Sequence, residues 1–179
     1  MNSFSVLSFI FKNRLIFPIF DYNNNVIGFG GRALSQNYLA KYINSPETEF
    51  FKKGFNLYNL NNAKSENKQS GVVFVVEGYM DAISLYQAGF KNVVATLGTA
   101  MTESHLNLIW RYFNDPVVCF DGDRSGQNAA HKISEKLIAY MKPNYSLSFL
   151  ILPNGFDPDS FVRKNGRNNF ESLLDQKID

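Results

Sequence analysis

The sequence predicts an α/β domain with a parallel sheet flanked by helices, preceded by a small β-rich, basic N-terminal annex. Two observations support this prediction. From residue 72 onward, short continuously apolar segments alternate with amphipathic segments, as strands and helices do in a sheet covered on both faces. Before residue 35, two apolar segments flank a run of three asparagines, as in a β-hairpin. The 179 residues suffice for one domain with a small annex.

The N-terminal annex begins with two predicted strands, residues 14–21 (RLIFPIFD) and 26–34 (VIGFGGRAL). We expect them to pair through a turn at residues 23–25, because asparagine tolerates left-handed backbone conformations. The sequence GFGG at residues 28–31 has the wrong spacing for a dinucleotide-binding loop and no helix follows it. It therefore predicts a strand bulge or a close backbone contact.

A long loop and a polar boundary are predicted next. Residues 35–54 show no clear period and contain a proline and a glycine, so we expect a loop there. Residues 61–71 (NNAKSENKQSG) are polar and mark a boundary. The predicted domains are residues 1–64, a basic β-rich part, and residues 72–179, an α/β domain.

Strands and helices alternate in the second domain. The predicted strands are residues 72–76, 92–98, 117–123 and 146–153. The predicted helices are residues 79–89, 102–113 and 126–140, and a short helix that carries residues 159–166. Thr102 is a suitable N-cap for the second helix, and Gly89 is a suitable end for the first.

Acidic side chains follow three of the four predicted strands. These residues are Glu77 with Asp81, Asp121 with Asp123, and Asp157 with Asp159. Open parallel sheets place their functional sites beyond the carboxyl ends of the strands. Because Asp81 stands one helical turn after Glu77, those two carboxylates can share a face. We therefore expect all six carboxylates to converge on one edge of the sheet.

Such a cluster is unfavourable without protons or cations. Two like charges about 4 Å apart repel by roughly 4 kcal/mol at an effective dielectric constant near 20. Oxygen ligands select hard cations, so the sequence predicts Mg²⁺ or Mn²⁺ and phosphoryl-transfer chemistry. Zinc is disfavoured, because neither His105 nor His131 belongs to the set.

Structural roles remain open for several of these acids. Asp157 could serve only as an N-cap, with Pro158 in the first helical turn. Asp123 or Ser125 could likewise cap the third helix. Glu77 has fewer structural uses, because it follows a buried strand. The glycines that follow Glu77 and Asp121 are expected to permit sharp turns and a close approach of the backbone to an ion or phosphate.

Charge and composition narrow the class of protein. Residues 1–70 contain eight Lys or Arg against four acidic residues, whereas residues 71–126 contain three against six. This asymmetry suits a phosphate-binding surface beside a metal site, although a solvated charged face is the alternative. The single cysteine, Cys119, excludes a disulfide framework, and its apolar neighbours predict a buried thiol. No apolar run approaches the length of a membrane span.

The motifs EGYMD (residues 77–81), DGDRSG (residues 121–126) and DPD (residues 157–159) resemble the TOPRIM fold of bacterial replicative primases of the DnaG type. The resemblance extends upstream through FKNRLIFPIFD, VIGFGGRAL, KYINSPET and FFKKGFNLYNL, and covers nearly the whole chain, from about Phe11 to Leu174. Residues known to function in that family match positions of this sequence one by one.

The resemblance implies roles for these positions. Glu77 would be a metal ligand and a candidate general acid or base in phosphodiester bond formation. Asp81, Asp121, Asp123, Asp157 and Asp159 would be metal ligands. Arg14, Arg32, Lys41, Asn44 and Lys53 would contact nucleotides and nucleic acid.

The resemblance also implies an activity and partners. The intact protein would be a DNA primase, a DNA-directed RNA polymerase that makes short RNA primers on single-stranded DNA in the bacterial cytoplasm. Its partners would be the DNA template, the RNA primer, nucleoside triphosphates and the replicative helicase, with (p)ppGpp as a candidate regulator. The family's zinc-binding, helical-bundle and helicase-binding domains have no counterpart here, so we interpret the chain as a catalytic-core fragment or a shortened homologue.

Two other functions are compatible with the fold. A topoisomerase or nuclease of the same superfamily would use the acids, but would leave the primase-like upstream segments unexplained. A non-catalytic module that binds nucleotides or an alarmone would not need six carboxylates.

Overall fold

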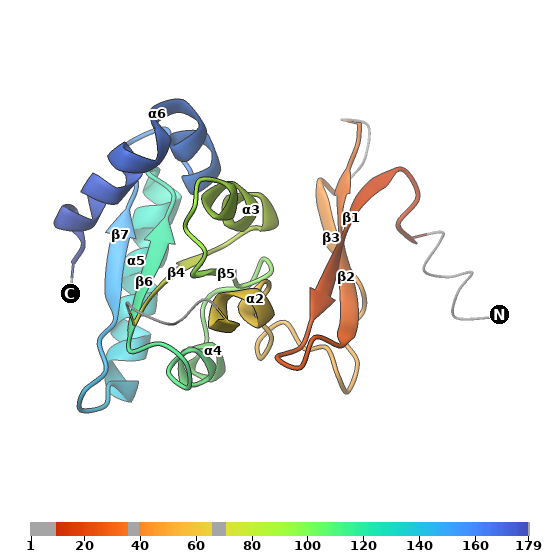
Figure 1. Cartoon of the computed structure of the whole chain (residues 1–179), viewed down its shortest axis with the longest axis horizontal. Helices are drawn as coiled ribbons and strands as arrows, with labels where there is room; N and C mark the ends of the chain where they lie inside the picture. Colours follow the sequence, from red (N-terminus) through yellow and green to blue (C-terminus); the bar gives the residue numbers. More distant parts are fainter. Residues whose placement is uncertain (1–9, 36–39, 66–70, 179) are drawn as a thin grey trace. The chain divides into compact units, whose positions relative to one another are not determined.

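The computed structural model describes residues 10–35, 40–65 and 71–178 (Figure 1). The chain divides into two compact units, Met1–Lys52 and Lys53–Asp179. This division falls between residues 52 and 53, earlier in the sequence than the gap between the predicted domains, residues 1–64 and 72–179. The predicted domain bounds stay a prediction. Among the described residues, no helix has both the length and the apolar character that crossing a membrane requires.

The first unit contains a three-stranded antiparallel sheet in the order β1-β2-β3. Its strands are β1 (Arg14–Phe20), β2 (Val26–Ala33) and β3 (Tyr42–Asn44). The predicted hairpin of β1 and β2 is confirmed, and Asn24 in its turn has φ = 68°, in the left-handed region that asparagine tolerates. The prediction of a loop throughout residues 35–54 is wrong at β3, which pairs with β2.

The glycines of β2 allow a ring to pack closely against the strand. A Cβ atom added to Gly31 would lie 2.6 Å from the ring of Phe11, closer than real Cβ contacts permit. The predicted close contact at GFGG is therefore confirmed, and its partner is an aromatic side chain.

The second unit contains a four-stranded parallel sheet in the order β5-β4-β6-β7. Its strands are β4 (Val72–Val76), β5 (Val93–Ala95), β6 (Asp115–Phe120) and β7 (Ser148–Ile151). All four lie within or overlap the predicted strands, so the parallel α/β architecture is confirmed. Because the strands are parallel, their carboxyl ends meet at one edge of the sheet.

Five α-helices accompany the sheet in the described part of this unit. They are α2 (Leu60–Ser65), α3 (Tyr79–Gln87), α4 (Glu103–Ile109), α5 (Arg124–Leu137) and α6 (Pro158–Ser172). As predicted, α3 is followed by Gly89 with φ = 98°, and Thr102 caps α4 by accepting a hydrogen bond from the His105 N–H. Helix α2 was not predicted, and α6 continues six residues beyond the predicted end, with an interruption at Gly166 (φ = 79°).

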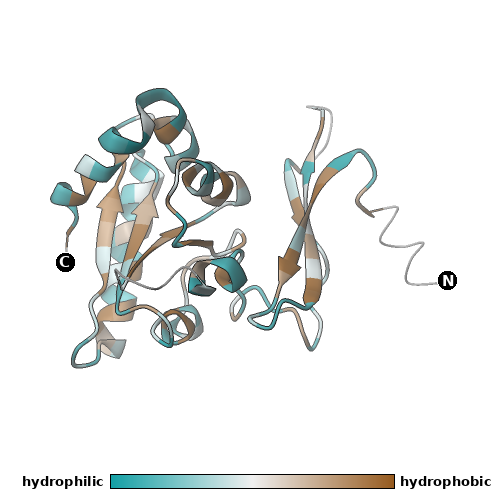
Figure 2. Ribbon diagram, in the orientation of Figure 1, coloured by the Kyte–Doolittle hydropathy of each residue, from teal (hydrophilic) through white to brown (hydrophobic). Residues whose placement is uncertain are grey.

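The core lies on both faces of the sheet. Val73 and Val75 pack with buried side chains of α4 and α5 on one face, whereas Phe74 and Val76 pack with α3 and α6 on the other. Alternation of consecutive side chains between the two faces explains why the strands are continuously apolar. Figure 2 shows these hydrophobic strands beneath helices that carry hydrophilic residues on their outer sides. Cys119 is buried, as predicted.

Candidate metal and catalytic site

The six carboxylates predicted from the sequence stand at the carboxyl edge of the parallel sheet, and we call them the acidic edge. Glu77 directly follows β4, and Asp81 lies in the first turn of α3. Asp121 and Asp123 follow β6, and Asp157 and Asp159 lie where α6 begins, after β7. Three separate chain segments therefore contribute to the acidic edge.

Electrostatic repulsion links all six carboxylates. Asp81 is repelled by Asp157, Asp121 and Asp159. Asp121 is repelled by Glu77, Asp157 and Asp123, and Glu77 by Asp123. These interactions show that neighbouring carboxylates of the acidic edge lie close enough to repel one another, as parallel strands with acidic ends predict.

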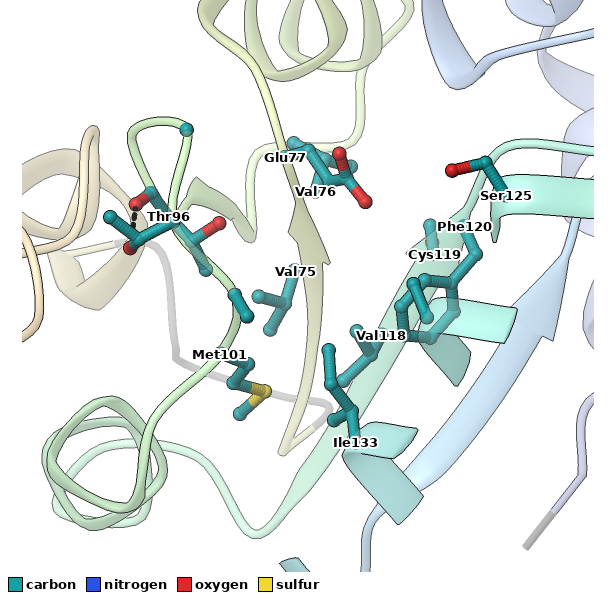
Figure 3. A pocket seen from close by; sticks show the side chains of 14 residues that line it. Val75, Val76, Glu77, Thr96, Met101, Val118, Cys119, Phe120, Ser125 and Ile133 are labelled. Atoms are coloured by element: carbon teal, nitrogen blue, oxygen red, sulfur yellow. Dashed lines mark hydrogen bonds between the residues drawn. The ribbon is translucent and has the colours of Figure 1, made fainter. Parts of the chain in front are cut away.

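Glu77 lies at the mouth of a pocket of about 300 Å³ between β4, β6, α5 and the loop after β5. In Figure 3, Glu77 and Ser125 occupy one end of the pocket, and Met101 and Ile133 occupy the other. The apolar walls remove water from one side of the carboxylate. Burial therefore raises the pKa of Glu77, and repulsion by Asp123 raises it further.

Asp81, in the first turn of α3, is less exposed than Glu77. Burial raises the pKa of Asp81 to about 7, against the opposing effect of a hydrogen bond from the Asp159 N–H, while neighbouring carboxylates add to the rise. Its Oδ2 atom also accepts from the Gly78 N–H at 3.2 Å, which completes the capping of α3. Asp81 thus joins the start of α3 to the start of α6.

Asp121 follows β6, the strand that lies between β4 and β7 in the sheet. Burial raises the pKa of Asp121 to about 6, and repulsion by Glu77, Asp157 and Asp123 contributes. Within the described residues, no hydrogen bond reaches the carboxylates of Asp121 or Glu77. Both oxygens of each group are therefore available to a cation or a substrate.

Asp123 and Asp157 perform the capping roles that the sequence left open. Asp123 caps α5 by accepting from the Gly126 N–H at 2.7 Å, and Asp157 caps α6 by accepting from the Ser160 N–H at 2.7 Å. Each of these bonds uses the Oδ1 atom alone. Capping and cation binding are therefore compatible in both residues.

Asp159 is held by two side chains that sequence reasoning missed. The Ser84 hydroxyl of α3 donates a short hydrogen bond to Asp159 Oδ1. Arg163 Nε lies 2.7 Å from the same oxygen, one helical turn along α6. The spacing of Asp159 and Arg163 is a recognisable i,i+4 signal, whereas the Ser84 contact spans 75 residues of sequence and has no local signal.

The backbone at Asp121 and Gly122 is tightly packed. A Cβ atom on Gly122 would lie 2.0 Å from the carbonyl oxygen of Pro153. The Gly122 N–H donates to Phe156 O at 2.8 Å, which ties the end of β6 to the segment before α6. Glycine is required here because another backbone, rather than an ion, approaches it.

The donor set of the acidic edge fits a hard divalent cation. It offers only carboxylate oxygens, the ligands that Mg²⁺ and Mn²⁺ prefer, and burial together with mutual repulsion makes the charged forms of Asp81 and Asp121 unfavourable without a bound cation. Among the described residues, however, no group of three or more His, Cys, Asp or Glu side chains is already placed to hold a metal ion.

The basic candidates occupy both units. Arg32, Tyr42 and Asn44 share one face of the first sheet, because Arg32 pairs with Tyr42 and Asn44 pairs with Gly30, two residues before Arg32. Arg14 pairs with Ala33 and therefore belongs to the opposite face; its Nη1 atom lies 3.4 Å from Lys41 O. Lys41 Nζ lies 5.7 Å from the centre of the Tyr42 ring.

Lys53 belongs to the second unit, where His105 holds its backbone. His105 Nδ1 accepts from the Thr102 N–H, so Nε2 carries the proton and donates to Lys53 O at 2.7 Å. Burial lowers the pKa of His105, and the hydrogen bonds to backbone carbonyls only partly offset this effect. His105 is therefore a buried neutral structural residue outside the acidic edge, and His131 is an exposed residue of α5 beside Glu135.

Comparison with known protein families identifies the class of protein to which the chain belongs. The family described as Toprim-like matches residues 74–162, which contain the parallel sheet and all six acids. A TOPRIM domain is thus the class of protein that this fold and acidic edge define. The family described as the N-terminal domain of the DNA primase catalytic core matches residues 2–64.

The chain belongs to the DnaG-type bacterial primase family. It is 46% identical to the DNA primase of Escherichia coli strain K12 over 94% of its length, and it spans 29% of that protein. A DNA primase domain from Pseudomonas aeruginosa superposes with a TM-score of 0.87 at 43% identity, covering 93% of this chain and 52% of that one. A DnaG primase catalytic domain bound to single-stranded DNA gives a TM-score of 0.86 at 45% identity, covering 93% and 53%.

Proposed function

We propose that this chain supplies the catalytic region of a DNA primase, which synthesises short RNA primers on single-stranded DNA by nucleotidyl transfer. The observation that carries the proposal is the acidic edge, where carboxylates from three strand ends repel one another in a DnaG-type fold. The chain spans less than a third of the length of its curated relatives, so we propose the activity of the whole primase rather than assign it to this chain.

The acidic edge would hold Mg²⁺ or Mn²⁺ through carboxylate oxygens of Glu77, Asp81, Asp121, Asp123, Asp157 and Asp159. Such ions, when bound, lower the pKa of an attacking hydroxyl and neutralise charge on the transferring phosphoryl group. Glu77 would accept or return a proton at its carboxylate, because burial moves its pKa upward toward the working pH.

The first unit would bind nucleic acid. Arg32 and Asn44 lie on one sheet face and offer phosphate and base contacts to the template, the RNA primer or nucleoside triphosphates. Arg14, Lys41 and Lys53 would add phosphate contacts. Supporting this proposal, a relative with 45% identity has been solved bound to single-stranded DNA.

The wider cellular setting is part of the same proposal. Family membership supports a role at the bacterial replisome in the cytoplasm, with the replicative helicase as partner and (p)ppGpp as candidate regulator. A topoisomerase, a nuclease or a non-catalytic module that binds nucleotides or an alarmone is not supported, because residues 2–64 match a domain of the primase catalytic core.

Replacing Glu77 tests the proposal. Glu77→Gln keeps the shape of the side chain and removes its charge, so primer synthesis on a single-stranded template should fall by at least about 100-fold. Circular dichroism and thermal unfolding of the variant should match those of the wild type. The matched control is Glu103→Gln, an exposed acid in the first turn of α4, which should retain activity. Primer synthesis by Glu77→Gln at the wild-type rate would overturn the assignment.

A further inference from the structure

The Ser84 hydroxyl is a buried group that the proposed chemistry does not use. Ser84 lies in α3, three residues after Asp81, so the two side chains leave the same face of the helix. The residue is only 4% exposed, and its hydroxyl donates to the Asp159 carboxylate. A buried hydroxyl bonded to an anion is a strong positional constraint.

Ser84 and Asp81 hold Asp159 at two points. The Asp159 carboxylate accepts from Ser84, while the Asp159 N–H donates to Asp81 Oδ1 at 3.2 Å. One turn of α3 therefore binds both the side chain and the backbone of the same residue of α6. Ser84 therefore holds the Asp159 side chain, and the Asp159 N–H in turn orients the Asp81 carboxylate.

Arg163 is the weaker constraint on Asp159. Its side chain is 63% exposed, so solvent and salt screen its interaction with the carboxylate. Ser84, in contrast, is excluded from solvent and has a fixed place in the α3–α6 contact. The Ser84 hydroxyl is therefore the main determinant of where the Asp159 side chain lies.

We propose that Ser84 is a positioning residue of the acidic edge: by fixing Asp159, it fixes Asp81 in the orientation that divalent cations require. The inference rests on the proposed function, because it assumes that the acidic edge binds such cations. Groups that orient metal ligands typically change metal affinity by 10- to 100-fold when they are removed.

The test is the affinity of the whole chain for Mn²⁺, measured by electron paramagnetic resonance of free Mn²⁺ in the absence of nucleotide. Ser84→Ala should weaken Mn²⁺ binding by about tenfold. This substitution leaves the net charge unchanged, so a loss of affinity reports orientation rather than electrostatic attraction. Ser84→Thr retains the hydroxyl and should keep wild-type affinity even if its added methyl group lowers the unfolding temperature.

Controls separate positioning from general stability. Ser134→Ala removes a hydroxyl that bonds only the carbonyl of His131 in α5, and should leave Mn²⁺ binding unchanged. Ser84→Cys, which keeps the volume but provides a weak donor, replaces the alanine variant if that variant does not fold, and should also bind Mn²⁺ more weakly.

Two outcomes distinguish this inference from the proposed function. If the wild type binds Mn²⁺ and Ser84→Ala binds it equally well or more tightly, the positioning role is wrong and the proposed function stands. If the wild type binds no Mn²⁺ at all, the cation site itself fails, and the inference fails with it.

Discussion

Single residues of the acidic edge combine structural and chemical roles to different degrees. Asp123 and Asp157 each cap a helix with one oxygen, whereas Asp81 and Asp159 are bonded to each other's helices. Glu77 retains a carboxylate that no described residue hydrogen-bonds. The residue types and strand-end positions predicted this cluster. Which carboxylates cap a helix, contact another helix or stay without a hydrogen bond depends on tertiary contacts that the local sequence does not show.

Asp81→Asn should change the stability of the metal-free protein in a pH-dependent manner. The pKa of Asp81 is raised from 3.8 to about 7, so the wild-type side chain favours folding at low pH. That contribution is complete below pH 3.8 and is lost as pH rises through about 7. Asparagine offers one acceptor oxygen where Asp81 offers two, so the variant loses one backbone hydrogen bond at every pH. Relative to wild type, its free energy of unfolding should therefore be about 1–3 kcal/mol higher near pH 8 than near pH 4.

Urea unfolding in a chelating buffer at both pH values measures this difference. Adding Mg²⁺ should stabilise the wild type more than Asp81→Asn, because the variant has lost a ligand charge. Asp175→Asn, which changes an acid of the C-terminal 3₁₀ turn, is the control and should show neither effect. A stability difference between Asp81→Asn and wild type that is the same near pH 4 and near pH 8 would contradict the assigned burial and repulsion.

At the scale of elements, the close approach of β6 to the segment after β7 positions Asp121. Gly122→Ala should destabilise the protein by at least about 2 kcal/mol, because the new Cβ would meet the Pro153 and Leu152 carbonyl oxygens at 2.0 and 2.4 Å. Gly54→Ala is the matched control, since its Cβ would meet only a methyl group 3.8 Å away. Equal unfolding midpoints for the two variants would contradict this prediction, because they would show that the backbone near Gly122 moves enough to accommodate the added Cβ atom.

His105 joins the start of α4 to the backbone of Lys53. His105→Ala should cost about 2–3 kcal/mol near pH 8, because it leaves a cavity and an unpaired carbonyl. The lowered pKa means that His105 contributes stability above pH 6.5, which is lost as pH falls toward the folded-state pKa. The free energy of unfolding should therefore fall more steeply below pH 6.5 in the wild type than in His105→Ala, so the difference between the two should narrow as pH falls, while exposed His131→Ala behaves as wild type.

Elements with a strong local pattern were predictable, and short ones were not. The strands of the second sheet are continuous apolar runs, and α4 has a threonine cap, so local sequence suffices. By contrast, α2 has the six-residue sequence LNNAKS, which contains two asparagines and is too short to be stable alone, and it is stabilised by burying Leu60 and Ala63. The three residues of β3 are likewise fixed by pairing with β2 rather than by any pattern of their own.

For the molecule as a whole, positive charge is concentrated at the start of the chain and the acidic edge lies in the second unit. Residues 1–70 contain twice as many basic as acidic residues, while the six acids follow residue 76. Four of the five proposed nucleic-acid contacts therefore lie in the first unit, with Lys53 in the second, whereas all of the proposed cation ligands lie in the second unit. Substitutions in the first unit should affect binding of nucleic acid and spare binding of cations.

Arg32→Ala tests this separation. It should weaken binding of single-stranded DNA several-fold and reduce the slope of log affinity against log salt by about 0.7, the value for one lost phosphate contact. Fluorescence anisotropy with a labelled oligonucleotide at several salt concentrations measures both quantities, and Mn²⁺ affinity should stay at the wild-type value. Lys132→Ala removes the same charge from an exposed position of α5 and should leave the slope unchanged. If both variants lose affinity equally, attraction by net charge alone explains the binding, and the sheet face that contains Arg32, Tyr42 and Asn44 has no special role.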